Sequence, residues 1–245
     1  MDANALPETV RRHVEPFLTD LKAVPGLTLH SAYVIGAAAR GEADPRRPQI
    51  AMALVLETMT ATELDGLARL GRRWGKRGFH APIVLTHEHV RRAQDVFPIE
   101  FLDWVHNHAC LLGTDLFAEV AIDRRHLRLQ CERELRLWLL NLSQAYLRSA
   151  GEASWLAGWF VERVEDLFPL LRAVLVLLGG DGQAGNTETV RRLERLVGGG
   201  LSVWVEAWEA RKEGRTLPRD QARRMFEAWE KGLSFLVEKV DGLSE

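Results

Sequence analysis

Residues 33–57 carry a pattern that could bind a phosphate-bearing ligand. An apolar run ends at Ile35, Gly36 and Ala37 form a small-residue turn, and a second apolar run covers residues 50–56. A glycine turn that opens a helix after a strand presents backbone N–H groups to phosphate oxygens. Two carboxylates at alternate positions of the next strand would share one face and could hold two Mg²⁺ ions. The chemistry to test for is therefore metal-dependent transfer of a phosphorus-bearing group.

The acidic half of this pattern is missing. Residues 48–56, which include the whole second apolar run, contain no carboxylate at any position. Charge neutralisation by metal ions dominates such transfers, and each ~1.4 kcal/mol lost costs tenfold in rate. Arg40 follows the turn closely enough to meet a bound phosphate. The expected nucleotide-binding positions, none of them a metal ligand, are Gly36, Ala37, Arg40, Gln49 and Ala51.

The periodicity of the chain changes near residue 123. Before it, helical and apolar stretches alternate, which is typical of a sheet flanked by helices. The expected strands cover residues 27–35, 50–56, 81–85, 97–105 and 109–112. After Asp123, an expected N-cap, only helical spacing follows, in residues 126–148, 155–178, 187–197, 201–211 and from Pro218 onward. We expect an α+β protein: a mixed-sheet domain of residues 1–122 and a helical bundle of residues 123–245.

Four stretches resemble the nucleotidyltransferase superfamily typified by DNA polymerase beta. They are the Gly36-Ala37 turn, the acidic loop of residues 41–45, the string DVFPIEFLD of residues 95–103, and LRLQCEREL of residues 127–135. In particular, the chain resembles uncharacterised bacterial nucleotidyltransferase-domain proteins that end in a helical bundle. The match covers roughly the first 150 residues of the sequence.

The resemblance also shows which functional groups are absent. Ala37 replaces the serine of the family turn, and Gln49 and Ala51 replace the two metal-binding acids. The third acid of the family lies on a later strand, where Glu100 is the best match and Asp103 the second. We therefore expect neither catalytic residues nor a metal site, and regard Glu100 and Asp103 as vestigial candidates.

Three functions fit these residues. The favoured one is a nucleotidyltransferase-fold protein without metal-dependent catalysis, with a weak nucleotide pocket or a scaffold or regulatory role and no cofactor. The second is an active, Mg²⁺-dependent enzyme that transfers a nucleotide to a small molecule, RNA or a protein. The third is an antitoxin-like or regulatory partner protein. Transfer of labelled nucleotide would identify the second, and co-purification with another chain the third.

Composition limits the cellular location and the kinds of partner that we expect for this protein. A net charge of −2 gives no signal for nucleic acid, the two cysteines lack metal-ribbon spacing, and no signal peptide or membrane-spanning run is present. We expect a cytoplasmic protein without nucleic-acid or membrane partners. His106, His108 and Cys110 alternate, but we favour ordinary polar histidines over a metal site.

The tryptophans concentrate in the helical half. Two pairs, Trp155 with Trp159 and Trp204 with Trp208, have the i,i+4 spacing that puts both rings on one helix face. We expect most of them in the bundle core. The sharper alternative is a homodimer that forms through the bundle, because tryptophan often anchors interfaces.

Overall fold

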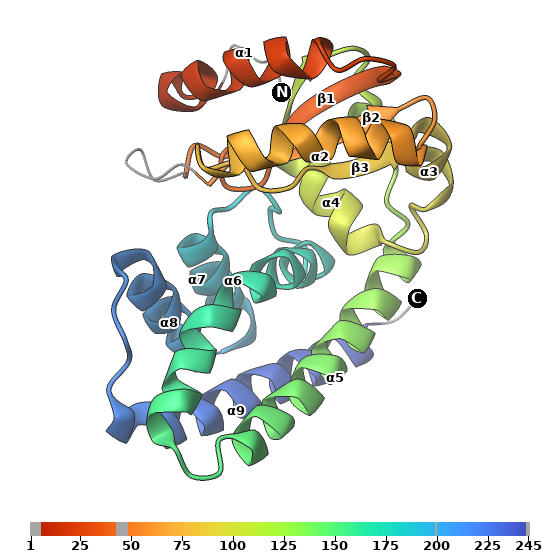
Figure 1. Ribbon diagram of the computed structural model, residues 1–245. Helices are drawn as coiled ribbons and strands as arrows, with labels where there is room; N and C mark the ends of the chain where they lie inside the picture. Colours follow the sequence, from red (N-terminus) through yellow and green to blue (C-terminus); the bar gives the residue numbers. More distant parts are fainter. Residues whose placement is uncertain (1–5, 43–48, 199, 244–245) are drawn as a thin grey trace. The chain divides into compact units, whose positions relative to one another are not determined.

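The computed structural model describes residues 6–42, 49–198 and 200–243 of the chain. It divides into two compact units, residues 1–95 with 103–121 and residues 96–102 with 122–245 (Figure 1). The chain thus changes unit between Ala121 and Ile122, and a short earlier segment clusters with the helical unit. Most of the acidic loop of residues 41–45 lies outside the described residues.

The first unit is built on a four-stranded mixed sheet with the order β3-β2-β1-β4. The strands are β1 (Leu29–Ile35), β2 (Ala51–Leu56), β3 (Ile83–Thr86) and β4 (His108–Leu112). Strand β1 pairs antiparallel with both β2 and β4, whereas β3 runs parallel to β2. Four of the five strands expected from the sequence are present.

Helices α1 (Glu8–Lys22) and α2 (Ala61–Gly75) share one apolar core with the sheet. A capping box, which the spacing of Thr60 and Glu63 in the sequence predicts, opens α2: the Thr60 hydroxyl accepts from the Glu63 N–H, and the Glu63 carboxylate accepts from the Thr60 N–H. Trp74 is buried and donates its Nε1–H to Asp20 at 3.0 Å, which ties α2 to α1. The helical spacing of Leu64, Leu67 and Trp74 predicts all three on the inner face of α2, but Leu64 is exposed.

The expected strand over residues 97–105 is wrong, because this segment forms helix α4 (Pro98–His106). Pro98 stands at its first position, where proline is favoured since that N–H needs no partner within the helix. Two shorter elements complete the first unit, helix α3 (His87–Arg92), capped by Thr86, and the 3₁₀ turn η2 (Leu116–Glu119).

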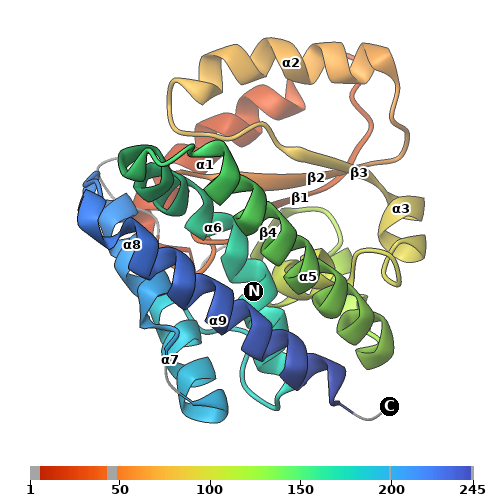
Figure 2. The same cartoon turned by 90° about the horizontal axis from the view of Figure 1, so that it is seen from below.

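The second unit is a helical bundle. Its helices are α5 (Arg124–Arg148), α6 (Ala153–Leu177), α7 (Asn186–Val197), α8 (Ser202–Glu213) and α9 (Ala222–Asp241), with the 3₁₀ turn η3 (Arg219–Gln221) before the last. Helices α5 and α9 run side by side in both views (Figures 1 and 2). Asp123 caps α5 as expected, accepting from the Arg125 N–H at 2.7 Å.

Aromatic rings fill the bundle core. Trp229 is fully buried and lies against Trp138, Phe160 and Trp204, with ring centroids 5.0–6.3 Å apart. The expectation that most tryptophans are core residues is confirmed for these three, while Trp155 is exposed. None of the described helices has the length and apolar character needed to cross a membrane.

Candidate functional site

The Gly36 turn connects β1 to a single helical turn. Gly36 has a φ of +67°, a left-handed conformation that favours glycine, and its N–H donates to the Asn107 carbonyl at 2.9 Å. The next residues wind tightly, since the Arg40 N–H donates to the Gly36 carbonyl and the Glu42 N–H to the Ala37 carbonyl. One short turn therefore holds Gly36, Ala37 and Arg40 together.

The strand register places Ala51 beside this turn. Ala51 pairs with Ile35, the residue before Gly36. Because Ile50, Met52 and Leu54 belong to the core under α1 and α2, Ala51 and its alternate neighbours face the other side of the sheet. Gln49 is exposed just before the strand.

These residues do not fit a pair of magnesium ions. Mg²⁺ selects oxygen ligands, above all carboxylates, whereas β2 (Ala51–Leu56) contains no acidic residue. Among the residues that the structure describes, no group of three or more His, Cys, Asp or Glu side chains could hold a metal ion. We therefore derive no reaction step through a metal.

Arg40 is the charged group of the site. Its side chain is only 8% exposed, and its Nε pairs with the Glu42 carboxylate at 3.0 Å. Its buried Nη1 has no hydrogen-bond partner in the described part of the chain. A buried guanidinium with an unused donor is costly unless an acceptor completes its hydrogen bonds, so this end of the side chain suits an anionic oxygen.

Glu100 and Asp103, the two candidate acids, lie on helix α4, and each accepts a hydrogen bond from a neighbouring amide side chain. Glu100 belongs to the helical unit and accepts from the Gln130 side chain at 2.9 Å. Asp103 belongs to the sheet unit and accepts from the Asn107 side chain at 3.0 Å. The Asn107 carbonyl also accepts from the Gly36 N–H, so Asp103 stabilises the turn indirectly, through Asn107.

His108 is a buried polar residue next to the turn. Its hydrogen-bond partners are not predicted by the sequence. His108 pairs with Ile35 across the sheet; its Nδ1 lies 2.7 Å from the Trp104 carbonyl and its Nε2 3.0 Å from Asp115. Both ring nitrogens are therefore occupied. His106 ends helix α4 rather than lying on a strand, so the three-residue alternation expected with Cys110 is not formed. In the sequence, only the alternation of His106, His108 and Cys110 indicated that this region could have a polar site.

Tyr33 fixes the loop that carries Asp115. Its hydroxyl donates to the Thr114 carbonyl at 2.8 Å and accepts from the Leu116 N–H at 2.9 Å. Burial raises the pKa of Tyr33 above its ordinary value. The side chain therefore stays a neutral donor and acceptor, and serves structure rather than proton transfer.

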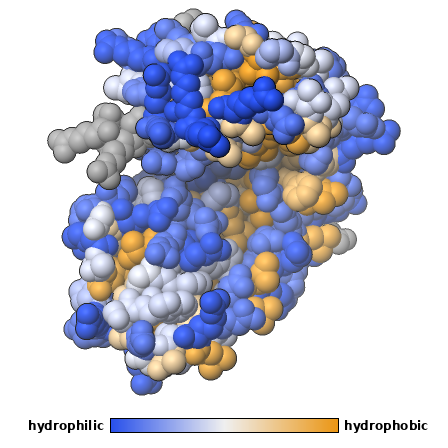
Figure 3. Space-filling model, viewed as in Figure 1, coloured by the Kyte–Doolittle hydropathy of each residue, from blue (hydrophilic) through white to orange (hydrophobic). Residues whose placement is uncertain are grey.

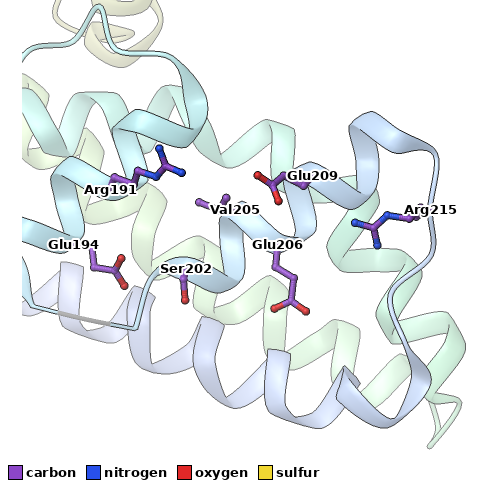
Figure 4. Close-up of a pocket in the computed structure, with 7 residues that line it drawn as sticks. All are labelled: Arg191, Glu194, Ser202, Val205, Glu206, Glu209 and Arg215. Atoms are coloured by element: carbon purple, nitrogen blue, oxygen red, sulfur yellow. The ribbon is translucent and has the colours of Figure 1, made fainter.

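A separate pocket of about 390 Å³ lies in the bundle, lined mainly by α7 and α8 (Figure 4). Two of its carboxylates already have partners within the chain. Glu194 accepts from the Gly200 and Leu201 N–H groups, and Glu206 pairs with Arg224 at 2.9 Å. Figure 4 shows the charged ends spread along the pocket rather than converging on one point. The pocket therefore lacks the convergent polar groups of a binding site.

Neither a protein-family model nor a curated protein sequence matches this chain.

Proposed function

We propose that the protein is a non-catalytic relative of the nucleotidyltransferases that binds a phosphate-bearing anion at the Gly36 turn without a metal ion. The observation that carries this proposal is Arg40: a guanidinium 8% exposed, with a buried Nη1 that has no partner among the described residues. Its backbone belongs to the turn that follows β1, which is where the resemblance expects nucleotide phosphates.

The arrangement of the strands supports the same proposal. Antiparallel β1 and β2 flank the turn, and Ala51 pairs with Ile35, the residue before Gly36. The resemblance expects a metal-binding carboxylate at the position of Ala51. Phosphoryl and nucleotidyl transfer depend almost wholly on positioning and charge neutralisation. Arg40, although paired with Glu42, can offer its unused Nη1 donor to an anion, but it cannot supply the bridging ligands of two metal ions. Binding without transfer is the function that this set of groups favours.

Calorimetry with ATP, with and without Mg²⁺, tests the proposal. We expect a weak affinity, with a Kd of roughly 0.1–1 mM, which corresponds to about −4 to −5.5 kcal/mol. Magnesium should not tighten it, since no carboxylate pair lies on β2. Arg40→Gln should weaken binding at least about tenfold, because the charge-assisted hydrogen bonds are lost.

Arg72→Gln is the matched control, since Arg72 is an exposed residue of α2 in the same unit and the substitution removes the same charge. It should leave the affinity unchanged. Equal weakening by both variants would mean that general charge, not this turn, attracts the anion. Tighter binding with Mg²⁺ would overturn the metal-free site, and transfer of labelled nucleotide to an acceptor would establish an active enzyme.

A further inference from the structure

Helix α2 has a strongly basic outer face. Residues 66–87, which include most of this helix, carry five Lys or Arg side chains and no Asp or Glu. All five are exposed: Arg69, Arg72, Arg73, Lys76 and Arg77. In Figure 3, strongly hydrophilic groups cover one end of the ribbon that Figure 1 labels α2. The net charge of −2 for the whole chain therefore conceals a local excess of positive charge.

Three of these cations are not neutralised by a carboxylate. Within the described part of the chain, no ion pair includes Arg69, Arg72 or Lys76, whereas Arg73 pairs with Asp20 at 2.8 Å. We call the three unpaired side chains the basic patch. The helix dipole favours cations in the last turn of a helix, but Arg69 lies before that turn. The dipole therefore does not account for the whole patch.

The basic patch points away from the core of the sheet unit. At about 100° per residue, its three members lie within about 60° of one another, on the side of the helix opposite the buried Leu67 and Trp74. From Arg69 to Lys76 the patch extends about 10 Å at 1.5 Å per residue. Like charges three or four residues apart on a helix repel each other. A bound polyanion would relieve this repulsion.

We propose that the basic patch binds the phosphates of a double-stranded nucleic acid without reading its bases. A duplex carries one phosphate per about 3.4 Å along each strand, so one strand presents about three phosphates over about 10 Å of its axis. The patch presents three cations over the same length. Two of them are arginines, whose forked donors match the oxygens of a phosphate.

The absence of an apolar anchor favours a nucleic acid over a protein partner. Protein interfaces centre on a few large aromatic or aliphatic side chains, whereas nucleic-acid interfaces are polar and positively charged. Over residues 65–82, all of which the structure describes, no large apolar side chain is exposed. Single strands are bound through exposed aromatic rings, but Trp74 and Phe79 of this stretch are buried. A duplex is therefore the nucleic acid that fits the patch.

Two open glycines leave room beside the patch. No atom of the described residues lies within 4 Å of where a Cβ would stand on Gly71 or Gly75, and Gly75 is one turn from Arg72. Gly66 of the same helix differs, because a Cβ there would lie 2.6 Å from a Val24 methyl group. Packing within the chain therefore requires Gly66 but not the other two. The side of α2 next to Arg72 is open to the close approach of a phosphate backbone.

Fluorescence anisotropy tests the proposal, with the full chain titrated into a labelled duplex of about 20 base pairs without Mg²⁺. Three phosphate contacts predict a Kd of about 10–100 μM in about 20 mM KCl and a slope of log K against log[KCl] of about −3. The double variant Arg69→Gln with Arg72→Gln should weaken binding at least about tenfold and reduce the slope to about −1, because two contacts are lost. Its melting temperature should match that of the wild type, since both residues are exposed.

Arg133→Gln with Arg136→Gln is the matched control. It removes two exposed arginines with the same spacing from α5, where both pair with carboxylates of their own helix. It should leave the affinity and the slope unchanged. Equal weakening by the two double variants would mean that general charge attracts the duplex, and overturns the proposal. So does a wild-type Kd above about 1 mM in about 20 mM KCl.

A single strand of the same length and a polyglutamate peptide distinguish the other polyanions. Both should bind more weakly than the duplex, because a single strand has the lower charge density and a peptide lacks phosphates. Tighter binding of the single strand would overturn the assignment to a duplex. Tighter binding of polyglutamate that the Arg69 and Arg72 substitutions abolish would assign the patch to an acidic protein instead.

The basic patch and the Gly36 turn can be tested separately. Arg40→Gln should leave duplex binding unchanged, because the Arg40 side chain is only 8% exposed and a duplex cannot reach it. Arg72→Gln alone should weaken duplex binding but leave the affinity of the turn for ATP unchanged. If either single variant weakened both ligands equally, one shared site would bind both, and the proposal of a separate patch would be wrong.

Discussion

At the scale of single residues, the Glu63 carboxylate joins the start of β1 to the start of α2. It accepts hydrogen bonds from the Thr28 hydroxyl at 2.5 Å, the Thr58 hydroxyl at 3.0 Å and the Thr60 N–H at 3.0 Å. These donors, first of all the Thr28 hydroxyl, lower the pKa of Glu63 from 4.5 to about 2. The folded state therefore stabilises the ionised form of Glu63.

Glu63→Gln should destabilise the protein in a pH-dependent way. Because the folded pKa of about 2 lies below the unfolded value of 4.5, the contribution of Glu63 is complete above pH 4.5 and disappears as the pH falls towards 2. The variant should melt below the wild type at pH 7, and the gap should narrow between pH 4.5 and pH 3. Calorimetry measures both. Asp65→Asn is the control, an exposed change on the same helix that should leave the melting temperature at pH 7 close to that of the wild type.

Residue-level prediction from sequence succeeded where the partners are local. Thr60 and Glu63 are three residues apart, and the capping box follows from that spacing alone. The contacts of His108 could not be foreseen in the same way. Asp115 reaches it only because Tyr33, more than 80 residues earlier, binds the loop between them. Likewise, the sequence places Arg40 after the turn but does not reveal that its side chain is buried.

At the scale of elements, two glycines with positive φ end strands of the sheet. Gly36 follows β1 with a φ of +67°, and no described atom lies within 4 Å of where a Cβ would stand. Gly113 follows β4 with a φ of +79°, and an added Cβ would lie 1.9 Å from the His30 carbonyl oxygen. Gly36 is needed for its conformation alone, whereas Gly113 also allows two backbones to approach.

Alanine substitutions should separate these two effects. Gly36→Ala should cost about 1–2 kcal/mol, the ordinary penalty for a left-handed non-glycine residue. Gly113→Ala should cost at least about 3 kcal/mol, because β1 and β4 must also move apart. Urea unfolding of both variants, followed by circular dichroism, measures the difference. Equal losses would mean that the turn after β4 relaxes without disturbing the sheet.

Prediction of the elements failed at α4 for a physical reason. The run FPIEFLDWV is apolar at consecutive positions, so neither the alternation of a strand nor the spacing of a helix stands out. Pro98 at the first helical position was the signal that could have decided it. Strand β2 was predictable because its apolar run is short and unbroken. Helix α5 was predictable because its buried residues recur every three or four positions after the cap at Asp123.

At the scale of the whole molecule, the chain builds two separate apolar cores. The core of the sheet unit includes Trp74, which contacts Phe17 and Phe79 with ring centroids 5.4 and 5.2 Å away. The core of the bundle includes Trp229 and its aromatic neighbours. The change of periodicity near residue 123 predicts a domain boundary at that point of the chain. Residues 96–102 also belong to the bundle unit, because of contacts such as the Gln130 side chain accepting from the Ile99 N–H at 2.8 Å. No local sequence pattern reveals such contacts.

Two cores of this kind predict that damage to one leaves the other protected. Trp229→Ala should cost the bundle about 3–5 kcal/mol, as expected for a fully buried aromatic residue, and speed amide hydrogen exchange in α6 and α9. The amides of β1 and β2 should exchange at wild-type rates. Trp74→Ala is the reciprocal variant and should speed exchange in β1 and β2 alone. If each substitution accelerated exchange equally in both units, the chain would unfold as one cooperative body, and the two cores would depend on each other for their stability.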